Sequence, residues 1–326
     1  MASQPSTPLI ATEKLSKTFS RQGVQQHVLR NLDLEIRQGD FTVIMGASGA
    51  GKSTLLYALS GMDTPTLGDV RYRGRSIVGL NQSELARFRR RACGFVFQQI
   101  HLLATLSLFD NAMAAGLLVT RDRAEVARRA EELLAAVGID SATASKFPAQ
   151  TSGGEAQRAA VVRALMNTPD VLFADEPTGA LDQASGAAVL DALTQANAAG
   201  QTVVLVTHDL RSARRGNRVL YLADGQIAGE LDLGGAVAAS AGGRAGHALG
   251  DQAGQTGQTG QSGQAGQTGQ TGQADQARRS RRAADPGGAG GPETGATPSA
   301  AATPPASDAE AARAAALRGF LADMGW

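Results

Sequence analysis

The chain has 326 residues with 31 lysines and arginines against 30 aspartates and glutamates, giving a formal net charge of +1 at pH 7. This balance gives no reason to expect a nucleic-acid partner, and the single cysteine, Cys93, excludes an internal disulfide and fits a small buried apolar position. No stretch approaches the ~20 unbroken apolar residues of a membrane span, and the first residues lack the basic-then-apolar order of a signal peptide, so we expect a soluble, cytoplasmic protein.

Two apolar segments near the N-terminus predict strands. HVLRNLDLEI, residues 27–36, alternates as a half-buried strand does, and FTVIM, residues 41–45, is continuously apolar, as in a strand buried on both faces. The glycine-rich stretch GASGAGKST follows at 46–54. After it, helical spacing predicts that four apolar residues share one side of a helix: Leu55, Leu56, Leu59 and Met62.

The glycine-rich stretch fits the pattern G-x-x-x-x-G-K-[ST], in which backbone N–H groups turn inward toward an anion. The helix that follows adds its N-terminal dipole, so the loop favours phosphate. Lys52 would reach the β- and γ-phosphates of a nucleotide, and the Ser53 hydroxyl would hold Mg²⁺. The alternative is an ordinary glycine turn, and the strand before the loop and the helix after it argue against that. The predicted phosphate-binding residues are Gly46, Ala47, Ser48, Gly49, Ala50, Gly51, Lys52, Ser53 and Thr54.

The pattern is mostly helical over residues 81–165. In its clearest segment, RDRAEVARRAEELLAAVGI, Asp122 and Glu125 form an N-terminal capping signal. The buried stripe of that helix is predicted to be Val126, Ala130, Leu133, Leu134 and Val137. Further on, TSGGE would open another helix, and a Ser-Gly-Gly turn at a helix N-terminus is a second anion site. That turn consists of Ser152, Gly153 and Gly154.

The second half of the globular region predicts two more buried strands, VLFAD at 171–175 and TVVLVTH at 202–208. A helix between them ends at Gly200, and RVLYLADGQIAGEL indicates a hairpin that turns at Asp224–Gly225. Strands that alternate with helices indicate an α/β fold around a mainly parallel sheet.

Two adjacent carboxylates follow the VLFAD strand. Asp175, at the end of a parallel strand beside the phosphate strand, would reach Mg²⁺ directly or through water. Glu176 is placed to polarise the water that attacks the γ-phosphate. The alternative for the pair is a surface acidic dipeptide at a strand end, and the glycine-rich loop favours the catalytic reading.

The composition changes at about residue 234. Between 234 and 307 almost nothing apolar is available to offset the ~1–2 kcal/mol per residue that ordering a backbone costs, so we expect a disordered linker. It includes seven Gly-Gln-X triplets, and the lack of proline in that run argues against a collagen triple helix. The arginine-rich segment 278–282 would contact acidic lipid or nucleic acid, or is a solvated charge run.

A short amphipathic helix is predicted at 308–326. Ser307 and Glu310 fit a capping box, and the apolar side consists of Leu317, Phe320, Leu321 and Met324. Such a helix on a long tether would dock on a partner or on a membrane surface, and a frayed end without a partner is the alternative.

These motifs, in this order, resemble those of an ATP-binding cassette (ABC) ATPase over about residues 9–230. GASGAGKST matches the Walker A motif, and VLFADEP matches the Walker B motif. GFVFQ, which ends at Gln98, matches the Q-loop, and TSGGE resembles the signature LSGGQ. ALD, ending at Asp182, matches the D-loop, and VTHD carries the switch histidine, His208. GMDTPTLGDV, the HLL after GFVFQ, and DEPTGALD resemble the branch of macrolide exporters (MacB-type), lipoprotein-release ATPases (LolD-type) and division-associated FtsE-type proteins.

The resemblance implies a P-loop NTPase fold of ABC type. A mainly parallel core would carry an antiparallel β-subdomain and a helical subdomain at about 86–165, with residues 1–233 forming the cassette. It further implies a head-to-tail homodimer that uses ATP and Mg²⁺, in which each nucleotide lies between the Walker motifs of one subunit and Ser152–Gly154 of the other. Asp182 would line the dimer seam.

The resemblance also implies residue roles. Phe19 would stack on adenine, with a core position in the β-subdomain as the alternative. Gln98 would contact Mg²⁺ and the attacking water, and His208 would contact the γ-phosphate and hold Glu176, which makes Glu176, His208, Gln98 and Lys52 the expected catalytic set. Two signature positions depart from the family, Thr151 in place of leucine and Glu155 in place of glutamine, and the second brings a repulsive carboxylate toward a triphosphate.

The function implied is that of an ATP-hydrolysing subunit that drives a separate membrane permease, in export or in lipid or lipoprotein extraction. It would lie on the cytoplasmic face of the membrane through that permease. An FtsE-type ATPase that transmits a conformational change without transport is the alternative. A soluble cassette acting on nucleic acid or the ribosome is disfavoured, because one cassette is present without a coiled-coil or zinc insertion.

Overall fold

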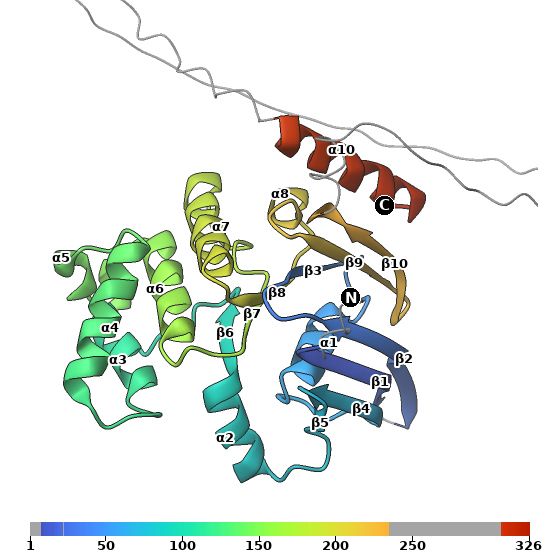
Figure 1. Ribbon diagram of the computed structural model, residues 1–326, viewed down its shortest axis with the longest axis horizontal. Coiled ribbons are helices and arrows are strands. Elements are labelled where there is room, and N and C mark those ends of the chain that lie inside the picture. Colours follow the sequence, from blue (N-terminus) through green and yellow to red (C-terminus); the bar gives the residue numbers. More distant parts are fainter. Residues whose placement is uncertain (1–7, 22, 235–307) are drawn as a thin grey trace, which may run out of the picture. The chain divides into compact units, whose positions relative to one another are not determined.

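The computed structural model describes residues 8–21, 23–234 and 308–326 (Figure 1). The predicted linker at 234–307 lies outside these ranges except for Gly234, and so does Ser307 of the predicted capping box. Among the helices that the structure describes, none combines the length and apolar content needed to cross a membrane.

A six-stranded sheet with the order β10-β9-β3-β8-β7-β6 forms the centre of the fold. Its strands are β3 (Phe41–Met45), β6 (Cys93–Phe97), β7 (Val171–Asp175), β8 (Thr202–Val206), β9 (Arg218–Ala223) and β10 (Gln226–Asp232). Neighbours pair in parallel except β10, which pairs with β9 in the antiparallel direction. Every residue of β3 and β8 is buried, which explains their unbroken apolar sequences. The predicted α/β fold is confirmed.

Within residues 81–165 the sequence pattern misses the strand β6, because the pattern indicates helices throughout that range. Its sequence, CGFVF, is short and contains a glycine. That glycine has a packing role, since a Cβ at Gly94 would lie 2.5 Å from the carbonyl oxygen of Ala164. The strand therefore approaches the helix beside it more closely than any side chain would allow.

An antiparallel sheet packs beside the central one, as expected for a β-subdomain. Its order is β2-β1-β4-β5, with β1 (Ile10–Arg21), β2 (Val24–Ile36), β4 (Leu67–Tyr72) and β5 (Arg75–Ser76). The helix α1 (Lys52–Leu59) shares one apolar cluster with both sheets. It ends at Leu59, so Met62, which the spacing placed on its buried side, lies beyond the helix and is 42% exposed. Gly61, with φ of 65°, turns the chain away from the helix axis before it reaches Met62.

Five helices and a 3-10 turn make up the predicted helical region (Figure 1). They are α2 (Gln82–Ala92), α3 (Leu108–Gly116), α4 (Arg123–Ala136), α5 (Ser141–Ala144), η1 (Pro148–Gln150) and α6 (Gly153–Leu165). The predicted cap of α4 is confirmed, because the Asp122 side chain accepts a hydrogen bond from the Glu125 N–H at 3.0 Å. Of its predicted stripe, Val126, Ala130 and Leu134 are buried and Leu133 and Val137 half-buried.

Three further helices pack on the face of the central sheet opposite to α1, where their residues form one apolar cluster with residues of the sheet. They are α7 (Gln183–Ala198), α8 (Leu210–Ala213) and α10 (Asp308–Asp323). The helix predicted near the C-terminal end of the sequence is thus present, and it belongs to the same compact unit as the sheet. The predicted hairpin is also confirmed, with φ of 47° at Asp224 and 74° at Gly225, as a tight β9–β10 turn requires.

Candidate functional site

The glycine-rich loop joins β3 to α1 in a conformation that its glycines permit. Gly46, Gly49 and Gly51 have φ of 153°, 81° and 100°, in the region that residues with a Cβ avoid. At Gly46 a Cβ would lie 2.2 Å from the carbonyl oxygen of Leu222 in the neighbouring strand β9. The loop is therefore wrapped tightly around the N-terminus of α1, where free N–H groups and the helix dipole favour an anion.

Lys52 stands in the centre of this loop. Its ammonium donates hydrogen bonds of 2.9 Å to the carbonyl oxygens of Gly46 and Ala47, and the residue is 7% exposed. Burial lowers the pKa of the Lys52 ammonium, and the charges of Glu176 and Asp175 oppose that shift. Two carbonyl oxygens are weak partners for a buried cation, so a phosphate in the loop would offer Lys52 a better one.

Asp175 lies at the end of β7 and faces the start of α1. Its carboxylate accepts hydrogen bonds from the Ser53 hydroxyl at 3.0 Å and the Tyr57 hydroxyl at 3.2 Å. Burial raises the pKa of the Asp175 carboxyl, and these two hydrogen bonds act in the opposite direction. Carboxylate and hydroxyl oxygens are ligands that Mg²⁺ prefers, and a cation here would stabilise the charge that burial disfavours. The residues fit a magnesium site.

Tyr57 is a residue of this site that sequence reasoning missed. It follows Ser53 by four positions on α1, so the i, i+4 spacing places both hydroxyls on one side of the helix. That spacing is a signal in the sequence from which Tyr57 could have been predicted.

Glu176 and His208 meet at the ends of neighbouring strands. The Oε1 atom of Glu176 lies 2.9 Å from Nδ1 of His208, and the Glu176 N–H donates to the carbonyl oxygen of Val206 at 2.9 Å. Glu176 has φ of 46°, a left-handed conformation that costs free energy in a residue with a Cβ. The pairing of β7 with β8 thus holds the two side chains together at the carboxyl edge of the sheet.

These residues surround one pocket with a volume of about 790 Å³. Its lining is Val28, Gly46, Ala47, Ser48, Gly49, Gly51, Lys52, Ser53, Thr54, Glu176, His208, Tyr221, Gly325 and Trp326. A volume of this size lies within the range of small-molecule and cofactor sites. Most of the predicted phosphate-binding residues and three of the four predicted catalytic ones, Lys52, Glu176 and His208, therefore face a common space. Four residues that were not predicted for this site join them: Val28, Tyr221, Gly325 and Trp326.

The predicted site residues that do not line this pocket are Phe19, Ala50, Gln98, Asp175 and Ser152–Gly154. Phe19 is 43% exposed, and the ammonium of Lys17 lies 5.0 Å from the centre of its ring. Gln98 follows β6, whose last residue pairs with Asp175, and packs against Gly179, where a Cβ would lie 2.8 Å from its Nε2. Gln98 thus belongs to the same sheet edge without facing the pocket.

The predicted second anion site forms the N-terminus of α6, away from that pocket. The Ser152 side chain accepts a hydrogen bond from the Glu155 N–H at 3.2 Å, and the Glu155 carboxylate accepts from the Ser152 N–H at 2.8 Å and hydroxyl at 3.0 Å. Hydrogen bonding from the Ser152 N–H lowers the pKa of the Glu155 carboxyl. Glu155 thus forms a capping box with Ser152, and its carboxylate occupies groups that a phosphate would otherwise bind.

Asp182 has a comparable structural role. Its side chain accepts hydrogen bonds of 3.0 Å from the N–H groups of Ala184 and Ser185 and so caps α7. The hydrogen bond from Ser185 lowers the pKa of the Asp182 carboxyl.

A family model described as ABC transporter matches residues 29–179. The chain is 41% identical over 219 residues to an uncharacterised ABC transporter ATP-binding protein of Methanocaldococcus jannaschii, covering 67% of this chain and 97% of that protein. It is 40% identical over 232 residues to the macrolide export ATP-binding/permease protein MacB of Escherichia coli, covering 71% of this chain and 35% of MacB. The chain thus spans about a third of the length of that relative.

Solved structures agree with these matches. The fold is similar to an ATP-binding cassette in a dimeric post-hydrolysis state bound to ADP and Pi, with a TM-score of 0.64 and 37% identity over 68% of this chain and 98% of that one. A second structure of the same cassette, described as a dimeric bacterial ABC transporter cassette, matches with a TM-score of 0.64 and 38% identity over the same shares of the two chains.

Proposed function

The chain belongs to the family of ABC transporter ATP-binding proteins, and we propose that it is the ATP-hydrolysing subunit of a transporter whose permease is a separate chain. It is an ATPase that uses Mg²⁺, in line with its family and with the cassette that was solved with ADP and Pi. MacB relatives join the two parts in one protein, as their name states, and this chain matches 34–35% of their length. The protein would then lie at the membrane through its permease.

The observation that carries this proposal is the meeting of two pairs of side chains around Lys52. Ser53 with Asp175 provides oxygen ligands, and Glu176 with His208 provides a positioned carboxylate. Mg²⁺, when bound, would neutralise charge on the phosphates. Lys52 would exchange the carbonyl oxygens of Gly46 and Ala47 for phosphate oxygens and stabilise the developing charge.

Glu176 would accept the proton of the attacking water. It is only partly buried, with 24% of its side chain exposed, so water reaches it, while His208 fixes its direction. The nitrogen of His208 that is not bonded to Glu176 would be free to contact the γ-phosphate. Gln98, at the same sheet edge, would approach the nucleotide only after a movement of the loop that follows β6, since it does not line the pocket here.

We infer that two copies assemble head to tail, with Ser152–Gly154 of one copy covering the nucleotide of the other. In one chain the α6 N-terminus does not line the Lys52 pocket, so a second copy is the simplest way to bring the two anion sites together. One related cassette has been solved as a dimer in two structures. An FtsE-like role, in which the same cycle transmits force without transport, uses identical chemistry in this subunit.

The test is ATP-dependent dimerisation of a Glu176→Gln variant, measured by analytical ultracentrifugation. We expect a dimer with ATP and Mg²⁺ and a monomer without nucleotide. Adding Gly153→Asp, which places a charge on the α6 N-terminus, should abolish the dimer and leave nucleotide binding unchanged. A variant that binds ATP and stays monomeric, even with the copurified membrane partner present, would contradict the sandwich. Copurification from membranes then identifies the permease.

A further inference from the structure

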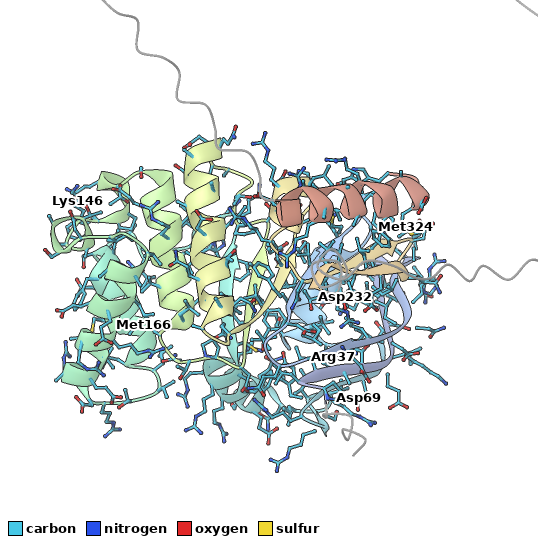
Figure 2. The ribbon with its side chains drawn as sticks, turned by 45° about the horizontal axis from the view of Figure 1, so that its top comes forward. Arg37, Asp69, Lys146, Met166, Asp232 and Met324 are labelled. Carbon is cyan, nitrogen blue, oxygen red and sulfur yellow. The ribbon has the colours of Figure 1, made fainter. Side chains whose placement is uncertain are left out.

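The helix α10 buries its apolar side against the cassette itself. Leu317 and Leu321 are 1% and 2% exposed and share an apolar cluster with residues of β9, β10 and α8. Gly229 of β10 allows a close approach, because a Cβ there would lie 2.9 Å from atoms of Phe320 and Met324. Figure 2 labels Met324 beside α10. The side that would serve as a docking peptide for another molecule is thus already covered within the chain.

This packing carries the end of the helix to the nucleotide pocket. After α10 the chain turns at Gly325, which has φ of 78°, and the Trp326 N–H donates to the carbonyl oxygen of Leu321 at 2.9 Å. The indole of Trp326 meets the ring of Tyr221 edge to face, with centroids 6.0 Å apart and planes at 72°. Tyr221 is buried and belongs to β9, beside the strand that leads into the phosphate loop. Trp326 is therefore positioned by a rigid neighbour.

The indole forms a wall of the pocket and leaves room inside it. With Trp326 in place the pocket still holds about 790 Å³, enough for a nucleotide. Trp326 is 45% exposed, so much of its surface is free to be covered by a ligand. Apart from His208, whose imidazole contacts Glu176, the aromatic residues that line this pocket are Tyr221 and Trp326, and Tyr221 is only 6% exposed. The largest accessible aromatic ring for a nucleotide in the pocket is therefore the indole of Trp326.

We propose that Trp326 is a nucleotide-contacting residue that α10 delivers to the pocket, so that docking of α10 and binding of a nucleoside triphosphate favour each other. The proposal rests on the proposed nucleotide site and adds a binding residue to it. The coupling is reciprocal: contact with the nucleotide adds free energy to the docked state of α10, and undocking of α10 removes the contact. The helix thus makes nucleotide affinity depend on a segment outside residues 9–230.

The sequence offers a direct probe, because Trp326 is its only tryptophan. The full chain is titrated with a non-hydrolysable ATP analogue and Mg²⁺ while tryptophan emission is recorded, and binding is measured independently by equilibrium dialysis. We expect a saturable change in emission whose midpoint equals the dialysis dissociation constant. Binding by dialysis with unchanged emission would overturn the contact. Absence of binding by dialysis would instead contradict the proposed function.

Variants distinguish a direct contact between Trp326 and the nucleotide from an effect of Trp326 on the stability of the fold. Trp326→Ala should weaken analogue binding about three- to tenfold, the range for a lost aromatic contact, and Trp326→Phe should restore part of it. Leu321→Asp should undock α10 and weaken binding by the same factor, whereas the matched neighbour Ala322→Asp, which is exposed, should bind normally. Unchanged or tighter binding by Trp326→Ala would overturn the proposal. If circular dichroism shows that Leu321→Asp does not fold, the binding affinities of Trp326→Ala and Trp326→Phe still test the proposal.

Discussion

Replacement of Glu176 by glutamine tests the proposed chemistry most directly. Glutamine has nearly the same shape, and its amide can keep the contact with His208, which is 2.9 Å in the wild type. The left-handed backbone at Glu176 is as strained with one side chain as with the other. We therefore expect the fold and ATP binding to be preserved, with a change in stability below about 0.5 kcal/mol, as for most partly exposed positions.

The expected effect on turnover follows from the loss of the proton acceptor. A positioned general base contributes ~10²–10⁴-fold to a rate, which corresponds to about 3–5 kcal/mol of activation free energy. His208 holds the glutamine in place but cannot give it a basic oxygen, so the full loss should appear in kcat. ATP would accumulate on the protein without being hydrolysed.

The assay is phosphate release under single-turnover conditions, with nucleotide affinity measured in parallel. Glu132→Gln is the matched control, because Glu132 is exposed on α4 and pairs only with Arg128 in the described structure. Its turnover should stay within about twofold of wild type, as for a weak surface ion pair. Wild-type turnover in Glu176→Gln, with ATP bound normally, would refute the assignment of Glu176 as the base.

Four further outcomes are expected. Lys52→Ala should weaken ATP binding itself at least about tenfold, since a charge-assisted contact to phosphate is lost, and unaltered binding by equilibrium dialysis would contradict the role of the loop. Glu155→Gln should keep the capping box at α6 and remove one negative charge. In a hydrolysis-deficient chain, we therefore expect the affinity of ATP-driven dimerisation, measured by ultracentrifugation, to rise about two- to fivefold. A weaker dimer would argue against electrostatic repulsion at this position. Burial raises the pKa of the Cys93 thiol to about 12, so alkylation at neutral pH should require unfolding, and rapid labelling of the native protein would contradict its burial. Because this folded-state pKa lies above the unfolded value of about 9, the thiol should contribute stability that is complete below pH 9 and lost as the pH rises toward 12, measurable by urea unfolding against Cys93→Ala.

Local features of the fold were predictable because they depend on residues that are neighbours in sequence. The phosphate loop follows from a buried strand, glycines that permit left-handed backbone, and a helix start, all within residues 41–59. The cap at Asp122 and the turn at Asp224–Gly225 are likewise fixed by side chains and backbone preferences a few positions apart. The short strand β6 was not, because five residues with one glycine carry too little periodicity to stand out among helices.

Other features depend on the order of strands in the sheet. Ser53 and Asp175 are 122 positions apart, and they meet because β8 lies between β3 and β7 and brings both strand ends to one edge. Glu176 reaches His208 for the same reason, since Asp175 pairs with Val206. The resemblance to a known family predicted the contact between His208 and Glu176. The sequence pattern placed the Asp175 strand directly beside the phosphate strand, and that prediction was wrong, because β8 lies between them.

The helix α10 shows which features the sequence determined and which depended on the tertiary structure. Its apolar spacing determined that one side would be buried, and left open against which surface. Only the tertiary structure decided that the surface is β9, β10 and α8 and that Trp326 reaches Tyr221. Periodicity is a property of one segment, whereas burial is a property of two surfaces, and the second surface forms only when distant strands have paired.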